Sequence, residues 1–212
     1  MANIVENTLF AIHVFPIFAI VFTIVFAVDV LQKRKVNFLR LAANYAFILY
    51  VITFFALVFL PLPTMEVAEK LSTHDMQCVP FRFVADIVCQ SPLVITDVHT
   101  YMAALTDKAV LQVVFNVLLT VPFGIFLTYF LHRDVKKVVI ASFALSLFVE
   151  VAQLTGLFFL FNGSYRLFDV DDLMANTIGG FLGYRLVSMT KAWLPSIERF
   201  DFVLVTGKVK RA

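Results

Sequence analysis

Long apolar stretches alternate with short polar connections along most of the chain. A stretch of about 20 apolar residues matches the length that an α-helix needs to cross the hydrocarbon core of a bilayer. Four clear stretches and one weaker stretch, which is diluted by Asn176, three glycines and Arg185, have about this length. We therefore predict about five membrane spans, at residues 9–31, 41–60, 110–131, 138–161 and 172–189.

The composition agrees with this pattern. Apolar residues make up 61% of the 212 residues, and charged residues make up only 15%. A charged side chain in the hydrocarbon core costs at least ~2.5 kcal/mol on insertion scales, so a membrane protein keeps most charges in its connections. The sequence therefore predicts an all-α, polytopic transmembrane helical bundle, and we treat residues 1–212 as a single membrane domain.

Lysine and arginine residues predict which side of the membrane each connection faces, because they stay in the cytoplasm when loops are short. They cluster after the first and third spans and in the carboxyl-terminal tail. The long connection 61–109, between spans two and three, instead holds six acidic residues against three basic ones. We expect a multi-pass protein of the bacterial cell membrane, with the amino terminus and this long loop outside and the carboxyl terminus in the cytoplasm.

The long outer loop contains both cysteines of the chain, Cys78 and Cys89. An exported loop lies in an oxidising environment, so a disulfide between them is one interpretation. Two free thiols, buried as small apolar groups, are the other. We expect no metal site, since ten residues separate the pair and no further cysteine or histidine stands at ligand spacing.

The same loop contains the segment MQCVPFRFVADIVCQ, which predicts a short amphipathic helix. Phe81, Val84, Ile87 and Val88 recur at helical spacing, whereas Asp86 falls elsewhere on the turn. The apolar side of such a helix could lie in lipid along the outer surface. Packing against the helical bundle explains the pattern equally well.

Polar residues inside three of the predicted spans also follow helical spacing. Each of them has to find a partner or line water, because polar groups are costly in lipid. Residues three or four apart share one face of a helix. The three polar faces consist of Asn116, Thr120 and Gly124 on the third span, Ser142, Ser146, Glu150 and Gln153 on the fourth, and Asp172, Asn176, Gly179 and Gly183 on the fifth.

The depths of these residues predict an outward-facing polar cavity. Counted at 1.5 Å per residue from the end of the fourth span, Glu150 lies about 16 Å deep, close to the midplane. A carboxylate at that depth is a costly way to hold helices together, although interhelical hydrogen bonds alone stay an alternative. The expected ligand-binding residues are Asn116, Glu150, Gln153, Arg166, Asp169, Asp171, Asp172 and Asn176.

Four segments carry a family resemblance: VPFRF in the outer loop, FNVLLTVPFG in the third span, SLFVEVAQ in the fourth, and RLFDVDDLMANTIGGFLGY leading into the fifth. In these segments the chain resembles the VanZ-like family of bacterial membrane proteins. Relatives often have Asn-Leu where this chain has Gln77 and Cys78. Besides the polar residues above, the resemblance implies structural roles for Pro80, Phe81, Pro122, Gly124, Gly179, Gly180 and Gly183.

The resemblance implies a function in the bacterial envelope, namely low-level resistance to teicoplanin, a lipid-tailed glycopeptide that binds cell-wall precursors. We expect membrane lipids as partners, together with the drug or a lipid-linked cell-wall precursor, and no nucleic acid. One alternative is an enzyme that modifies a lipid-linked substrate, with Glu150 or Asp171 as general base and Arg166 on a phosphate. A small lipid or solute carrier is another, and the sequence names no cofactor.

Overall fold

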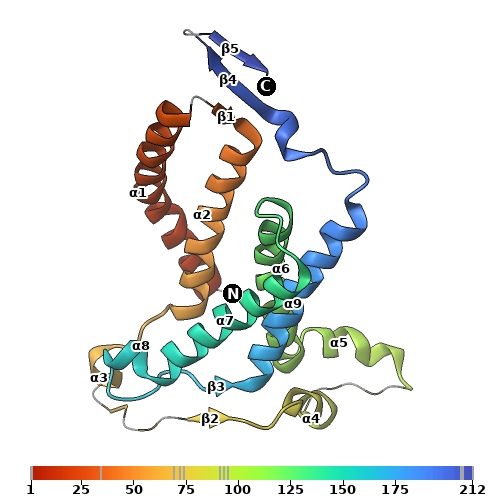
Figure 1. Ribbon diagram of the computed structural model, residues 1–212. Coiled ribbons are helices and arrows are strands. Elements are labelled where there is room, and N and C mark those ends of the chain that lie inside the picture. The colour runs from red at the N-terminus through yellow and green to blue at the C-terminus, as the bar shows by residue number, and fades with distance from the viewer. Residues whose placement is uncertain are drawn as a thin grey trace. The chain divides into compact units, whose positions relative to one another are not determined.

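The computed structural model describes residues 2–33, 35–68, 70–71, 73, 75–90, 92, 94, 96–205 and 208–211. It is mostly helical, with 74% helix, which agrees with the predicted helical architecture. The long helices are α1 (Ala2–Lys33), α2 (Phe38–Phe59), α6 (Lys108–Tyr129), α7 (Val135–Leu154) and α9 (Val170–Thr190), shown in Figure 1.

Shorter elements occupy the connections. The short helices are α3 (Met65–Ala68), α4 (Arg82–Gln90), α5 (Tyr101–Leu105) and α8 (Gly156–Phe159), and the 3-10 turns are η1 (Val98–Thr100) and η2 (Ile197–Phe200). The strands are β1 (Lys35–Asn37), β2 (Met76–Gln77), β3 (Phe168–Asp169), β4 (Asp201–Val205) and β5 (Lys208–Arg211).

Three helical segments in the described part of the chain are long and apolar enough to cross a membrane: Leu9–Val28, Phe38–Phe59 and Lys108–Tyr129. They correspond to the first, second and third predicted spans. The fourth and fifth predicted spans fall on α7 and α9, which have 20 and 21 residues. At 1.5 Å per residue, each of these two helices is about 30 Å long, close to the thickness of the hydrocarbon core.

The helices group into two compact units, one made of residues 1–61 and 189–212 and the other of residues 62–188. In the first unit α1 packs along α2, with the ring of Phe22 edge-on to that of Tyr45 at 5.0 Å. The side chain of Asn37 caps α2 by accepting from the Arg40 N–H at 2.8 Å, and its amide donates to the carbonyl of Ile197 at 2.8 Å. Asn37 thus ties the start of α2 to the chain that follows α9.

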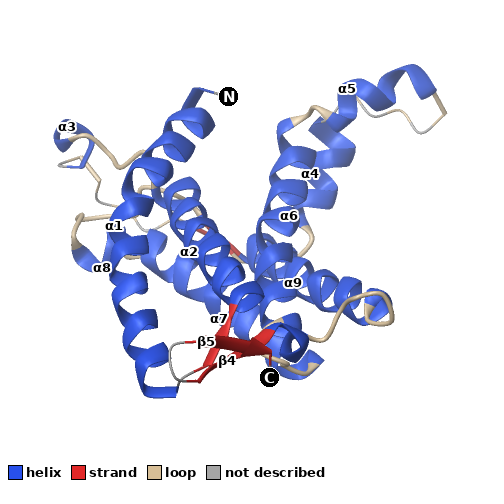
Figure 2. Cartoon of the chain, turned by 90° about the horizontal axis from the view of Figure 1, so that it is seen from above, coloured by secondary structure: helices blue, strands red, loops and turns tan. Residues whose placement is uncertain are grey.

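Two small sheets were not expected from the apolar pattern. In the first unit the strand order is β1-β4-β5, all antiparallel, and β4 and β5 lie side by side in Figure 2. In the second unit β2 pairs with β3 in parallel. The sequence did not reveal these strands because each has two to five residues and pairs with a segment that is mostly far away along the chain.

In the second unit α9 packs tightly against α6 and α7 through glycines. A Cβ atom on Gly179 would clash with the carbonyl oxygen of Val117, and one on Gly180 would clash with the Ser142 hydroxyl. Between helices in lipid there is no hydrophobic driving force, so association depends on such close approach of backbones. The structural roles implied for the glycines of the fifth span agree with these contacts.

The fourth predicted span is shorter than expected. We predicted one helix from 138 to 161, but α7 ends at Leu154, where Thr155 accepts from the Phe158 N–H at 3.1 Å. Gly156 follows with φ +62, a conformation that favours glycine, and a Cβ there would also clash with the carbonyl of Phe161. The chain therefore turns away seven residues before the predicted end of the span.

The long connection contains the predicted short helix, which is α4. Val84 and Val88 on this helix are exposed, so the helix does not use them to pack on α6. Neither interpretation of the cysteines agrees with the structure, because Cys78 and Cys89 are free and both are exposed. No bond joins them, and neither thiol is buried.

The glycine contact between α9 and α6 can be tested by Gly179→Ala. The added methyl group meets the backbone of Val117, which cannot move without shifting α6, so we expect the free energy of unfolding to fall by about 1–3 kcal/mol. Ser188→Ala, on an exposed position of the same helix, is the control and should change little. Thermal unfolding of the detergent-purified proteins measures the effect, and equal stability of the two variants would contradict this packing.

Candidate functional site

The β2–β3 pair brings two distant segments together at one end of α9. Gln77 on β2 stands opposite Asp169 on β3, and α9 begins directly after β3. The residues of β2 lead through Val79 and Pro80 into α4. This pairing therefore places the start of α4 next to the start of α9.

Asp171 holds α4 in place. Its two carboxylate oxygens accept from the backbone N–H groups of Phe81, at 2.6 Å, and Phe83, at 2.9 Å. The first N–H groups of a helix have no partner within the helix, and a negative charge is favourable at that end. Asp171 is buried, so backbone N–H groups at the start of α4, and not water, hydrogen-bond to its carboxylate. We predicted a ligand-binding or catalytic role for this residue, but in the structure both of its oxygens serve α4.

Gln77 connects the same segments through its side-chain amide. The amide nitrogen donates to the carbonyl of Val79 at 2.9 Å and lies 3.3 Å and 3.4 Å from carboxylate oxygens of Asp169 and Asp171. Gln77 is buried, so these contacts satisfy a group that would otherwise be costly. The sequence drew attention to Gln77 only as a departure from the family pattern.

Glu150 lies near the end of α7 and not at mid-helix depth. Because α7 ends at Leu154, Glu150 is four residues, or about 6 Å, from that end, instead of the 16 Å that we predicted from a span ending at 161. Its carboxylate accepts from the backbone N–H of Asp169 at 2.9 Å. Glu150 therefore supports the segment that leads into α9.

Asp172 joins α9 to α6. Its Oδ1 atom accepts from the amide of Gln112 at 3.2 Å and from the amide of Asn116. One turn further along α9, the amide of Asn176 donates to the Ser146 hydroxyl on α7 at 2.9 Å. The predicted polar faces of the three helices thus do turn toward one another.

These polar faces make direct hydrogen bonds, which was the alternative to a cavity between them. The hydroxyl of Thr120 on α6 donates to the backbone carbonyl of Asn176 at 2.7 Å, and Thr120 is completely buried. Gln153 is buried as well. Within the described residues, only the Ser142 hydroxyl and Asn176 Oδ1 lack a partner in this contact region. The region between α6, α7 and α9 is therefore mostly filled by the protein itself.

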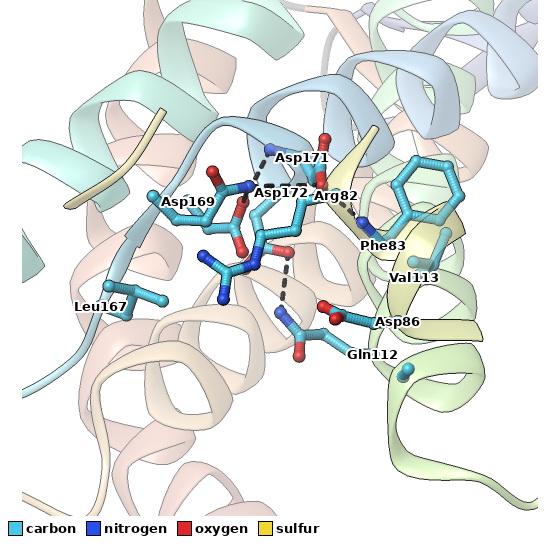
Figure 3. Close-up of a pocket in the computed structure, with 11 residues that line it drawn as sticks. Arg82, Phe83, Asp86, Gln112, Val113, Leu167, Asp169, Asp171 and Asp172 are labelled. Atoms are coloured by element: carbon cyan, nitrogen blue, oxygen red, sulfur yellow. Dashed lines mark hydrogen bonds between the residues drawn. The ribbon is translucent and has the colours of Figure 1, made fainter. Parts of the chain in front are cut away.

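A pocket of about 190 Å³ opens instead at the end of this region, between α4, the first turns of α6 and the segment that leads into α9 (Figure 3). We call it the acidic pocket, because four carboxylates and one guanidinium group line it. Its lining residues are Gln77, Arg82, Phe83, Asp86, Ala109, Gln112, Val113, Leu167, Asp169, Asp171 and Asp172.

Three of the eight predicted ligand-binding residues line the acidic pocket: Asp169, Asp171 and Asp172. Of the other five, Asn116 bonds to Asp172 and Glu150 bonds to the backbone of Asp169. Gln153 and Asn176 belong to the buried contact region, and Arg166 is exposed and outside the lining. Sequence reasoning missed Arg82, Asp86 and Gln112, which come from α4 and the first turn of α6. Their place in the pocket depends on the hydrogen bonds from Asp171 to α4, for which a single sequence contains no local signal.

The charges around the acidic pocket affect one another. Burial raises the pKa of Asp169 above its usual range, and the negative charge of Asp171 acts in the same direction. The Asp171 N–H, the Gln77 amide and the positive charge of Arg82 oppose this rise. In Figure 3 the Arg82 guanidinium lies beside Asp169 within the pocket. The pocket therefore combines hydrogen-bond acceptors with one fixed cation.

Of the three candidate catalytic residues, one belongs to the lining of the acidic pocket. Asp171 lines the acidic pocket, whereas Glu150 lies behind Asp169 and Arg166 stands outside the lining. Among the described residues, no three His, Cys, Asp or Glu side chains are grouped so that they could hold a metal ion. The arrangement is suited to binding a polar group through carboxylates, an amide and a guanidinium.

The comparison with known families agrees with the resemblance seen in the sequence. Residues 47–191 match the VanZ/LLP1 family, and this range contains every residue of the acidic pocket. Because the match covers more than half of the chain, the protein belongs to the VanZ/LLP1 family. No curated protein and no solved structure matches the chain.

The role of Asp171 can be tested by hydrogen exchange. Asp171→Ala removes the acceptors of the Phe81 and Phe83 N–H groups, so we expect faster exchange in residues 82–90 and a loss of about 1–3 kcal/mol of stability. Asp172→Ala is the matched control, since Asp172 accepts from side chains of α6 and not from α4. Unchanged protection of α4 in Asp171→Ala would contradict the role that we assign to this carboxylate.

Proposed function

We propose that this VanZ/LLP1-family membrane protein lowers the susceptibility of a bacterium to lipid-tailed glycopeptides such as teicoplanin, by binding the drug or a lipid-linked cell-wall precursor in the acidic pocket. The observation that carries the proposal is the pocket itself. It lies at one end of α6, a helix long and apolar enough to cross the membrane. A polar group at the membrane surface could therefore reach it.

The lining of the acidic pocket supports a ligand that is rich in hydrogen-bond donors. Carboxylates accept from hydroxyl, amide and ammonium groups, all of which occur on sugars and peptides. Arg82 adds a partner for a phosphate or a carboxylate. The lining also has an apolar part, which consists of Phe83, Val113 and Leu167. Such a mixed lining suits the polar end of an amphipathic molecule.

The size of the pocket limits what it can enclose. Sites that bury a drug-sized ligand usually have about 300–1,000 Å³, and the acidic pocket has about 190 Å³. A complete glycopeptide or a complete lipid-linked precursor is larger than this. We therefore propose that only one sugar, amine or phosphate group enters, while the rest of the ligand stays at the membrane surface.

The two strand pairings support an outer location for the pocket. Paired strands lie on the same side of a membrane, so an even number of crossings separates them. Between β2 and β3 lie α6 and α7, and between β1 and β4 lie the same two helices together with α2 and α9. If α6 and α2 cross the membrane, α7 and α9 therefore cross as well.

This count gives five crossings when α1 is included. The basic residues that follow α1 favour the cytoplasm for β1 and β4, so β2 and β3 fall outside. The acidic pocket, which is lined by Gln77 of β2 and Asp169 of β3, then opens outward. That is the side on which lipid-tailed glycopeptides meet cell-wall precursors.

An enzyme remains the second candidate, but it has less support. Carboxylate chemistry on a lipid-linked substrate needs an acid or base and a phosphate-binding group around one space. Asp171 uses both oxygens to hold α4, and Glu150 bonds to the Asp169 N–H. We therefore propose binding rather than chemistry as the function of the acidic pocket.

The proposed orientation can be tested with the native cysteines and a fusion. Cys78 is exposed beside β2, so a membrane-impermeant maleimide should label it in intact cells that lack an outer membrane. A reporter enzyme that is active only in the cytoplasm should be active after Ala212. The Cys78→Ser, Cys89→Ser double variant controls for specific labelling. Labelling of Cys78 only after cell lysis, or a fusion without reporter activity, would contradict the five-span arrangement.

The binding proposal can be tested by teicoplanin resistance in a susceptible bacterium. Arg82→Ala, Asp86→Asn and Gln112→Ala change the lining of the acidic pocket without removing the bonds from Asp171 to α4. At equal membrane abundance, we expect the inhibitory concentration to fall toward that of cells without the protein.

Two exposed positions outside the pocket provide matched controls: Arg133→Ala and Glu66→Gln should leave protection unchanged. Full protection by all three pocket variants would reject the pocket as the binding site. Mass spectrometry of extracted lipid-linked precursors separates binding from modification, because a new covalent product would favour the enzyme.

A further inference from the structure

Helix α4 turns charged side chains toward the acidic pocket and leaves two of its apolar side chains exposed, while its apolar residues Phe83 and Ile87 are half-buried. Its polar residues Arg82 and Asp86 line the acidic pocket, on the side toward α6. Val84 and Val88, one turn apart, point away from the protein and are 45% and 65% exposed. A helix on the surface of a soluble protein turns its apolar side to the core and its charges to the solvent. The two exposed valines, together with the charges that line the pocket, indicate that the medium outside α4 is apolar.

The height of α4 along α6 indicates which apolar medium this is. Phe83 and Asp86 of α4 line the same pocket as Gln112 and Val113 of α6. Gln112 lies four residues from the start of α6, which is about 6 Å along the helix axis. Figure 2 also shows α4 beside α6, near the end from which α5 extends. Because α6 is long and apolar enough to cross a membrane, α4 lies level with one edge of the hydrocarbon core.

The orientation of α4 is held by hydrogen bonds at its start. Asp171 accepts from the N–H groups of Phe81 and Phe83, so α4 cannot rotate about its axis without breaking them. Phe81, which directly precedes α4, has φ +64 and an exposed side chain. The exposed side formed by Phe81, Val84 and Val88 is therefore a fixed surface.

A second element at the same end of the unit also exposes apolar side chains. Near the end of α7, Glu150 accepts from the Asp169 N–H, and near the start of α6, the Gln112 amide donates to Asp172, so both helix ends meet the segment that leads into α9. There α8 follows, and Phe158, Phe159 and Leu160 are exposed, with Phe159 at 80%. Phe158 and Phe159 have φ of 56 and 69, a left-handed conformation that costs about 1–2 kcal/mol per residue. The ring of Phe158 lies 5.4 Å from that of Phe148, measured between centroids, whereas Phe159 is the more exposed of the two.

We propose that α4 lies in the boundary between the headgroups and the acyl chains of the bilayer, with Phe81, Val84 and Val88 toward the acyl chains. Amphipathic helices bind there through an apolar side buried about 5–10 Å deep. The occupant of this surface is lipid, because the surface lies beside a helix that is long and apolar enough to cross the membrane. Since the other side of α4 lines the acidic pocket, the pocket opens at the level of the lipid headgroups.

The proposal can be tested by tryptophan fluorescence in vesicles. Trp193 is the only tryptophan of the chain, so Trp193→Phe provides a background without tryptophan. Val88→Trp then reports on the exposed side of α4, and Phe83→Trp on the pocket side of the same helix. Both proteins are reconstituted in phosphatidylcholine and phosphatidylglycerol vesicles, with and without lipids brominated near the top of the acyl chains.

We expect brominated lipid to reduce the emission of Val88→Trp strongly and that of Phe83→Trp only slightly. Acrylamide in the aqueous phase should have little effect on Val88→Trp. Val84→Trp lies on the same exposed side and replaces Val88→Trp if that variant does not fold, as judged by circular dichroism and gel filtration. Emission that acrylamide quenches and brominated lipid does not, at both positions 84 and 88, would overturn the proposal. This outcome would leave the binding role of the acidic pocket untouched, because resistance is measured separately.

Discussion

The hydrogen bonds between the Asp171 carboxylate and the start of α4 are the contact on which the rest of the site depends. They join two segments that lie about 90 residues apart in the chain, and they use a buried charge to complete the open end of a helix. Together with the β2–β3 pairing and the contacts of Gln77, they place Arg82 and Asp86 beside the first turns of α6. The acidic pocket exists because this carboxylate is held at the start of α9, where Glu150 supports the backbone of Asp169 from behind.

A second constraint, the close approach of α9 to α6 and α7, places that carboxylate. Gly179 and Gly180 let the backbone of α9 contact Val117 and Ser142, and Asp172 and Asn176 of the same helix bond to α6 and α7. Lipid supplies no hydrophobic force between helices, so packing and hydrogen bonds have to supply the association. Polar residues of these helices thus stabilise the contacts that position the pocket, and most of them lie outside its lining.

The sequence predicted the helical architecture and the mutual orientation of the polar faces, because apolar length and helical spacing are local properties. The predicted distance of Glu150 from the end of its helix was too large, because α7 ends at Leu154 and not at residue 161. Gly156, with its positive φ, was the one local sign of that end, and it lies inside an otherwise apolar run. Gln77, Arg82 and Gln112 were missed for a different reason. Each reaches the pocket through contacts with a segment far away in the chain, and spacing within a single segment does not reveal such contacts.

Asp171 and Asp172 both hold helices in place and line the acidic pocket. Substitutions at these two residues therefore cannot separate the function of the pocket from its structure. Asp171 uses both oxygens for α4, and Asp172 receives two amides from α6, so replacing either one changes the position of a helix as well as the chemistry of the lining. Arg82, the first residue of α4, is exposed, and its side chain lines the pocket. It contributes a positive charge that the contacts between the helices do not require. A ligand that depends on Arg82 carries a phosphate or carboxylate group, whereas a ligand that is indifferent to Arg82 is held by donors to the carboxylates alone. Under the binding function that we propose, the charge of this one side chain therefore distinguishes a phosphate-bearing lipid-linked precursor from an amine or sugar group of a drug.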